Sequence, residues 1–144
     1  MRLPNKIDTH VHRECRQPPP SYSYRESSNK GPPLWVHGDL HPANVVVSDG
    51  TLSGIVDFGD MFAGDPALDL AAAWVLLPAG TASRFFDTYA RADEAAIRRA
   101  RGLAAMKSLF LILMGQNGDR GLPGGKPNWG PAGRAALDRV LKGV

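Results

Sequence analysis

Two short apolar runs joined by one turn signal constrain the fold of this chain more than any other feature of its sequence. The runs are Asn44–Ser48 (NVVVS) and Leu52–Phe58 (LSGIVDF), and Asp49-Gly50 lies between them. β-branched residues favour strands, and an Asp-Gly pair favours the tight turn of an antiparallel hairpin. The sequence therefore predicts a β-hairpin that brings Asn44, at the start of one strand, beside Asp57, near the end of the other.

The segment after the hairpin has the pattern of helices. Asp65-Pro66 combines an N-cap acceptor with proline at the first helical position. The residues that follow, ALDLAAAWVLL, are apolar on every side except at Asp69, so we expect this helix to be buried. Further helices are predicted over residues 82–92, 94–114 and 131–141, with a Gly/Pro-rich loop before the last.

Apolar residues at helical or strand spacing predict the core. On the helix over residues 94–114, the expected inner face consists of Leu103, Met106, Phe110 and Leu113. Large aromatic side chains elsewhere are also expected in the core rather than in a substrate site: Trp35, Trp74, Phe85 and Phe86.

The strand and helix patterns together indicate an α+β fold of one-domain length, since the chain has 144 residues. A short strand is expected at Leu34–Val36. Residues 1–33 hold six of the twelve prolines and show no lasting period. We therefore predict an irregular or disordered leader over residues 1–33, followed by one folded domain over residues 34–144.

Charge and hydropathy argue against a nucleic-acid or membrane partner. Residues 1–30 contain six of the 17 basic residues and three of the 14 acidic ones, so the net charge of +3 belongs to the leader. No basic patch interleaved with aromatic residues supports nucleic-acid binding. The longest apolar stretch, LAAMKSLFLILMG, is too short to span a bilayer. The single cysteine, Cys15, and the lack of a signal-peptide pattern favour the cytoplasm.

Acidic, histidine and asparagine side chains are concentrated around the hairpin. His37-Gly38-Asp39 is followed by Asn44 in the spacing H-x-D-x-x-x-x-N, and Asp57-Phe58-Gly59 ends the hairpin. Phosphoryl transfer needs a carboxylate that orients the attacking hydroxyl and oxygen ligands that hold Mg²⁺. The two motifs, in this order and joined by a hairpin, are typical of the catalytic and metal-binding loops of kinases.

These motifs belong to a longer pattern. Residues 36–71 (VHGDLHPANVVVSDGTLSGIVDFGDMFAGDPALDLA) contain H-G-D-x-x-x-x-N, then V-D-F-G-D, then D-P-x-x-D-L-A. The segment resembles the aminoglycoside phosphotransferase family, which has a protein-kinase-like fold and transfers the ATP γ-phosphate to hydroxyl groups of small molecules. We expect the resemblance to run from about Pro33 to the C-terminus. It implies a kinase-like C-terminal lobe, in which the catalytic-loop hairpin is followed by a mostly α-helical bundle.

The resemblance implies chemical roles for three residues. Asp39 would be the catalytic base that faces the hydroxyl of a small-molecule substrate. Asn44 and Asp57 would be the Mg²⁺ ligands and, through the metal, would bind the phosphates of ATP.

Other residues would support the site. By the same resemblance His37 would position the catalytic loop, and Asp69, the lone charge of a buried helix, would pair with that loop. Asp60 either assists the site or begins a turn. His41 is expected in an exposed loop rather than as a ligand, and Trp129, expected in a loop, is a candidate for substrate contact.

The residues ahead of the motifs do not resemble the N-terminal lobe of the family. No glycine precedes Gly31, so a Gly-rich phosphate loop is missing, and Lys6 and Lys30 lie outside any strand pattern. We therefore expect a truncated protein that lacks an adenine pocket. Little activity is expected of this chain alone, because a second lobe excludes water from the site.

Two other functions fit parts of the sequence. Ile7–Glu14 (IDTHVHRE) is similar to the D-x-H-x-H opening of metal-dependent amidohydrolases, in which His10 and His12 would bind metal. The second is a non-catalytic binding or interaction module. Its apolar face, where an N-terminal lobe would dock, would bind a partner or support self-association.

Overall fold

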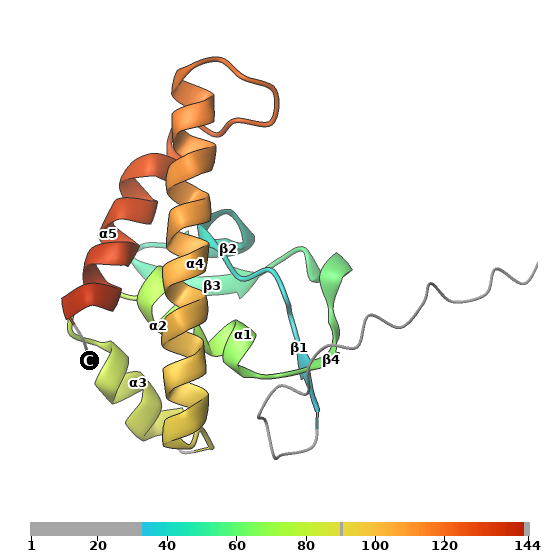
Figure 1. The fold of residues 1–144 in the computed structure, drawn as a ribbon. Coiled ribbons are helices and arrows are strands. Elements are labelled where there is room, and N and C mark those ends of the chain that lie inside the picture. Colours follow the sequence, from blue (N-terminus) through green and yellow to red (C-terminus); the bar gives the residue numbers. More distant parts are fainter. Residues whose placement is uncertain (1–32, 90, 143–144) are drawn as a thin grey trace, which may run out of the picture.

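The computed structural model describes residues 33–89 and 91–142. The predictions for the leader, including the pair His10 and His12, lie outside these residues. The predicted α+β class is confirmed, because two small antiparallel sheets lie beside a group of helices (Figure 1). Among the described residues, no helix combines the length and apolar character needed to cross a membrane.

The predicted hairpin is present. β2 (Val45–Ser48) pairs antiparallel with β3 (Thr51–Ile55). The turn residues Asp49 and Gly50 have φ of 51° and 73°, as the tight turns of right-twisted hairpins require. The second strand ends at Ile55, earlier than predicted, and the chain then forms a 3₁₀ turn at Phe58–Asp60.

A second small sheet was not predicted. β1 (Leu34–Val36), the expected first strand, pairs antiparallel with β4 (Phe62–Gly64), where the sequence had suggested the start of helical structure. Three residues are too few to show a strand period, so only the pairing defines β4. This sheet places the residues ahead of His37 beside those that follow Asp60.

The first predicted helix forms as two short pieces, α1 (Ala67–Leu70) and α2 (Ala72–Val75). Asp65 supplies the predicted capping acceptor, since its Oδ1 accepts the N–H of Ala67 at 3.0 Å, but α1 begins at Ala67 and not at Pro66. The N–H of Trp74 donates to the carbonyl of Ala71 three residues back, which tightens the chain between the two pieces. The prediction of burial is confirmed, because most of this segment lies in the core.

Three longer helices follow: α3 (Ala82–Tyr89), α4 (Glu94–Asp119) and α5 (Trp129–Lys142). In α4 the predicted N-terminus is confirmed, since Asp93 accepts the N–H of Ala96, but the helix continues beyond Met114, where we expected it to end. α4 is the longest element, and α5 lies along it (Figure 1).

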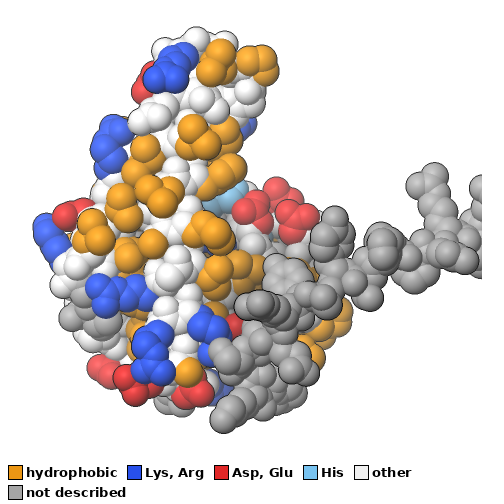
Figure 2. Space-filling model, viewed as in Figure 1, with side chains coloured by type: hydrophobic (Ala, Val, Ile, Leu, Met, Phe, Trp, Pro, Cys, Tyr) orange, Lys and Arg blue, Asp and Glu red, His pale blue; other side chains and the backbone are white. Residues whose placement is uncertain are grey.

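The predicted inner face of α4 was wrong except at Leu103, which is half-buried and packs against the core. Met106, Phe110 and Leu113 are each more than half exposed, and hydrophobic side chains run along the visible face of the helix (Figure 2). The side that is buried carries small residues, notably Ala100, Ala104, Ser108 and Gly115, together with Leu111.

Close approach of α5 explains this choice of small residues. A Cβ on Gly133 of α5 would lie 2.7 Å from the backbone nitrogen of Ile112 and 2.8 Å from the carbonyl oxygen of Ser108. A Cβ on Gly115 would collide with the backbone of Gly130. The two helix backbones therefore pack almost directly against each other, and the larger apolar side chains of α4 are left on its outer side.

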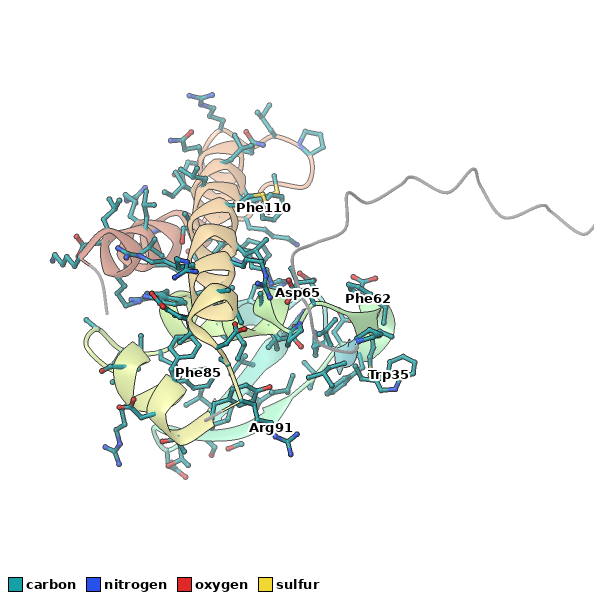
Figure 3. All side chains as sticks on the ribbon, turned by 60° about the horizontal axis from the view of Figure 1, so that its bottom comes forward. Trp35, Phe62, Asp65, Phe85, Arg91 and Phe110 are labelled. Carbon is teal, nitrogen blue, oxygen red and sulfur yellow. The ribbon has the colours of Figure 1, made fainter. Side chains whose placement is uncertain are left out.

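The core lies between the short helices and α3, α4 and α5. Trp74 is 1% exposed, and its ring packs against Phe86 with centroids 5.2 Å apart. Trp74 and Phe86 are thus in the core as predicted, with Phe85 packed against them. The prediction for Trp35 was wrong, since this side chain is 74% exposed and points away from the fold (Figure 3). The side chains of successive strand residues face opposite sides of a sheet, and in β1 the side chain of Val36 is on the buried side.

Candidate functional site

The loop between β1 and β2 carries most of the residues singled out in the sequence, and its first turn is fixed by Asp69 of α1. The two oxygens of this carboxylate accept the backbone N–H groups of His37 (2.6 Å) and Gly38 (3.0 Å). The expected pairing of Asp69 with the loop is thus present. Both bonds are charge-assisted, which makes them stronger than bonds between neutral groups.

His37 connects this loop to the segment after the hairpin. The side chain is buried; its Nε2 lies 2.9 Å from the carbonyl oxygen of Val56, and its Nδ1 accepts the N–H of Asp39. A neutral ring with the proton on Nε2 satisfies both contacts. The ring also packs against Phe58, with centroids 4.7 Å apart. With both ring nitrogens engaged inside the fold, His37 orients the backbone at Asp39.

Gly38 allows the loop to approach the turn after the hairpin. Its φ is +85°, in the region that favours glycine, and a Cβ would lie 2.8 Å from the carbonyl oxygen of Asp60. A side chain at position 38 is therefore disfavoured both by the positive φ and by the close carbonyl oxygen of Asp60. Asp60 takes part in this contact through its main chain, and its side chain is exposed.

Asp39 and Asn44 lie side by side in the loop. The Nδ2 group of Asn44 donates to the main-chain oxygen of Asp39 at 2.9 Å and to its Oδ2 at 3.4 Å. Asn44 is 5% exposed, whereas the Asp39 side chain is 46% exposed. The buried amide of Asn44 therefore holds the Asp39 carboxylate in place at the surface. Figure 2 shows acidic side chains gathered beside a histidine next to α4.

His41 contacts the same carboxylate from the other side of the loop. Its Nδ1 accepts the N–H of Ala43, so the ring proton lies on Nε2, which is 3.3 Å from Oδ2 of Asp39. The ring packs on Trp129, with centroids 4.9 Å apart. Two expectations are corrected here: His41 is only 16% exposed, and Trp129 is the first residue of α5 rather than part of a loop.

The predicted approach of Asn44 and Asp57 is present in the backbone. The N–H of Val56, the residue before Asp57, donates to the carbonyl of Asn44 at 3.0 Å. Asp57 has a φ of 64°, which is uncommon for a residue with a side chain, and its side chain is exposed. Asp57 therefore lies at the end of the hairpin beside the Asp39 loop, and no hydrogen bond joins the Asp57 side chain to Asn44 among the described residues.

Lys107 of α4 also lies at the site, although it belongs to none of the sequence motifs. Its Nζ donates to the carbonyl of Leu40 at 3.3 Å. Burial lowers the pKa of Lys107, and the nearby carboxylates of Asp69 and Asp39 oppose this effect. The only signal in the sequence was a lysine inside an apolar helix, where a charge needs a partner.

A second ion pair, between Asp65 and Arg99, supports the helices next to the site. The Nε of Arg99 lies 2.8 Å from Oδ2 of Asp65, whose Oδ1 also caps α1. Burial favours the neutral form of Asp65, but the hydrogen bonds from Arg99 and from Ala67 N–H prevail and hold its pKa below the ordinary value. This pair joins α1 to α4 and makes no contact with Asp39 among the described residues.

No group of three or more His, Cys, Asp or Glu side chains within residues 33–89 and 91–142 is arranged to hold a metal ion alone. Mg²⁺ on a nucleotide does not need one, since it keeps waters and uses one or two protein ligands together with phosphate oxygens. The assignment of Asn44 and Asp57 as metal ligands stays a prediction.

Comparison with known proteins adds one finding. A family model described as "Phosphotransferase enzyme family" matches residues 2–103. The match begins well ahead of Pro33, where we expected the resemblance to start, and it ends within α4 instead of continuing to the C-terminus. No curated protein and no solved structure matches the chain.

Proposed function

The chain belongs to the phosphotransferase enzyme family, and from this premise we propose that it transfers the γ-phosphate of ATP to a hydroxyl group of a small molecule. One observation carries the proposal. Oδ2 of Asp39 is held by Asn44 and by His41, whereas Oδ1 accepts no hydrogen bond from the residues that the structure describes. A half-exposed carboxylate with one fixed and one free oxygen is suited to orient an incoming hydroxyl.

In this proposal Asp39 is the catalytic base. Its free oxygen would accept the hydrogen bond of the substrate hydroxyl and aim the attacking oxygen at the γ-phosphorus. The transition state of phosphoryl transfer is loose, so positioning and electrostatic stabilisation matter more than strong basicity. The hydrogen bond from Asn44 and the contact with His41, both at the other oxygen, therefore reduce the reactivity of Asp39 little and fix the direction of its carboxylate.

The residues proposed to hold Mg²⁺ have suitable donor atoms. The amide nitrogen of Asn44 is used inside the loop, which leaves its Oδ1 for a cation. Asp57 offers an exposed carboxylate at the end of the neighbouring hairpin. Asn44 and Asp57 would hold the metal beside the phosphates of ATP, where its charge would offset theirs. Within the chain, the role of Asn44 is to fix Asp39, and the role of His37 and Asp69 is to hold the loop.

We also propose that the α+β unit corresponds to the C-terminal lobe of a kinase-like fold. The order of its parts supports this: a loop with H-G-D, a hairpin, a D-F-G turn and then helices. The acceptor would lie near Asp39, where the Trp129 and His41 rings form an adjacent aromatic surface.

The proposal is tested by incubating the full chain with γ-labelled ATP, Mg²⁺ and a panel of hydroxyl-bearing small molecules. Asp39→Asn keeps the size of the side chain and should lower transfer by about 10²- to 10⁴-fold, the usual loss of an acid–base group. Asp49→Asn, in the exposed hairpin turn, is the matched control and should retain the wild-type rate. Equal transfer by both variants would reject Asp39 as the base.

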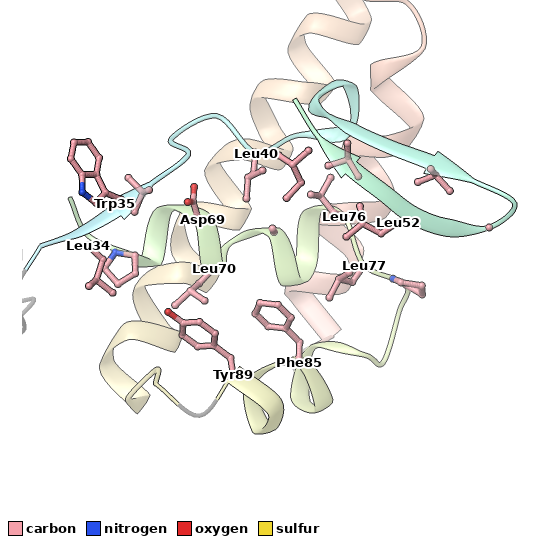
Figure 4. A pocket seen from close by; sticks show the side chains of 18 residues that line it. Leu34, Trp35, Leu40, Leu52, Asp69, Leu70, Leu76, Leu77, Phe85 and Tyr89 are labelled. Carbon is pink, nitrogen blue, oxygen red and sulfur yellow. The ribbon is translucent and has the colours of Figure 1, made fainter. Parts of the chain in front are cut away.

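A second candidate function, a non-catalytic interaction module, is favoured by one surface. An apolar groove of about 620 Å³ runs between the hairpin, β1 and the short helices, with Leu34, Leu52, Leu70 and Phe85 among its lining residues and Asp69 as its charged member (Figure 4). Such a surface is suited to a partner or a second copy. Sedimentation with and without ATP–Mg²⁺ distinguishes the enzyme from the interaction module. An oligomer whose size does not change when ATP–Mg²⁺ is added supports the module.

A further inference from the structure

We propose that Lys107 is a positioning residue of the catalytic loop, which it holds from α4 through the Leu40 carbonyl. The proposal rests on the proposed function, because it assigns to Lys107 the task of fixing the direction of Asp39. It adds a residue from a separate element, 67 positions along the chain from Leu40, to a site that the motifs place wholly within residues 37–69.

The contact lies at the point where the loop most needs an anchor. The start of the loop is held by Asp69 through His37 and Gly38, and its end is held by the 3₁₀ turn at Pro42–Asn44. The Leu40 carbonyl lies between these two ends. Its peptide unit joins Leu40 to His41, whose ring contacts the Asp39 carboxylate. Holding this carbonyl therefore restrains both sides of the contact between Asp39 and His41.

The charge of Lys107 points to the same role. A partly buried ammonium group is costly unless polar or charged partners surround it, and here these partners all belong to the site: the Leu40 carbonyl and the carboxylates of Asp69 and Asp39. An apolar residue would fill the same place on α4 at lower cost if packing alone mattered. α4 is also a rigid support, since α5 packs closely along it.

The test combines kinetics with amide hydrogen exchange on the full chain. Lys107→Met keeps the length of the side chain and removes the ammonium. It should lower kcat roughly tenfold to a hundredfold, the value of one charge-assisted hydrogen bond, with KM for ATP and acceptor within about twofold of the wild type by the same reasoning. The amides of Ala43 and Asn44, which are bonded within the loop, should exchange about tenfold faster.

Two controls separate positioning from general stability. Lys142→Met removes an exposed lysine that pairs with Asp138, and it should change neither the kinetics nor the loop amides. Lys107→Cys in a Cys15→Ser background, alkylated with bromoethylamine, restores an ammonium at nearly the original distance. This rescue should return kcat and loop protection toward the wild type. If Lys107→Met does not fold, Lys107→Gln is measured with the same readouts.

The outcomes are distinct. Loop amides that exchange as in the wild type would overturn the proposal, and so would a rise in exchange equal throughout α4, α5 and the loop. Failure of the alkylated variant to restore protection would overturn it as well. If the wild-type chain transfers no phosphate, the proposed function fails, and the exchange measurements still decide whether Lys107 anchors the loop.

Discussion

Replacing Asp69 with asparagine is the change for which the structure gives the clearest expected magnitude. The carboxylate accepts two backbone N–H groups, from His37 and Gly38, at 2.6 and 3.0 Å. Asparagine has the same shape but one acceptor oxygen, so one N–H would face the amide NH₂ group and lose its partner. A hydrogen bond to a charged group contributes about 1.5–3 kcal/mol, and a buried unsatisfied donor costs about 1–3 kcal/mol.

Since the site is only partly buried, we take the lower part of these ranges and expect Asp69→Asn to lower the free energy of unfolding by about 2–3 kcal/mol. For a domain of this size, this corresponds to a decrease in Tm of roughly 4–12 °C. Urea unfolding followed by circular dichroism gives the free energy, and amide exchange shows where the change is located. The amides of His37 and Gly38 should lose protection first.

Asp87→Asn, on the exposed side of α3, is the matched control and should change the free energy of unfolding by less than about 0.5 kcal/mol. If Asp69→Asn also stays within this limit and the two loop amides keep their protection, then Asp69 does not hold the loop.

Three further predictions concern stability. Gly38→Ala should destabilise the chain by about 1–3 kcal/mol more than Gly50→Ala in urea unfolding, because both have positive φ but only Gly38 lacks room for a Cβ; equal losses would contradict the close approach. Gly133→Ala should separate α4 from α5 and lower Tm. Gly102→Ala on α4, where a Cβ meets open space, should instead raise the free energy of unfolding by about 0.5–1 kcal/mol. Asp65 has a folded-state pKa below its ordinary value, so its contribution to stability is complete above the unfolded-state pKa and is lost as the pH falls through the folded-state pKa. Asp65→Asn should therefore reduce the loss of stability below about pH 4, and an unchanged dependence of stability on acid pH would contradict this.

The hairpin and the cap of α1 could be predicted because their signals are local. Asp49-Gly50 can adopt positive φ, and Asp65 bonds to an N–H two residues away. The proximity of Asn44 to the residues around Asp57 follows from hairpin geometry alone. The pairing of Asp69 with the loop was expected because a charge in a buried helix needs a partner, although the sequence could not specify the two N–H groups.

Other features depend on contacts between distant segments and left little trace in the sequence. β4 exists only through its pairing with β1. The buried side of α4 was misassigned because hydrophobicity points to Met106 and Phe110, whereas the close approach of α5 demands small residues. Lys107 could be connected to Leu40 only once α4 was placed in space.

The central claim is that Asp39 orients a hydroxyl for phosphoryl transfer, and single-turnover kinetics test it most directly. With ATP–Mg²⁺ and an acceptor at saturation, rapid quenching measures the chemical step, and equilibrium titration measures nucleotide affinity separately. We predict that Asp39→Asn slows the chemical step by about 10²- to 10⁴-fold and leaves the Kd for ATP–Mg²⁺ within about threefold of the wild type, as removal of a group that acts only in the transition state requires. An Asp39→Asn variant that transfers phosphate at the wild-type rate would contradict the claim.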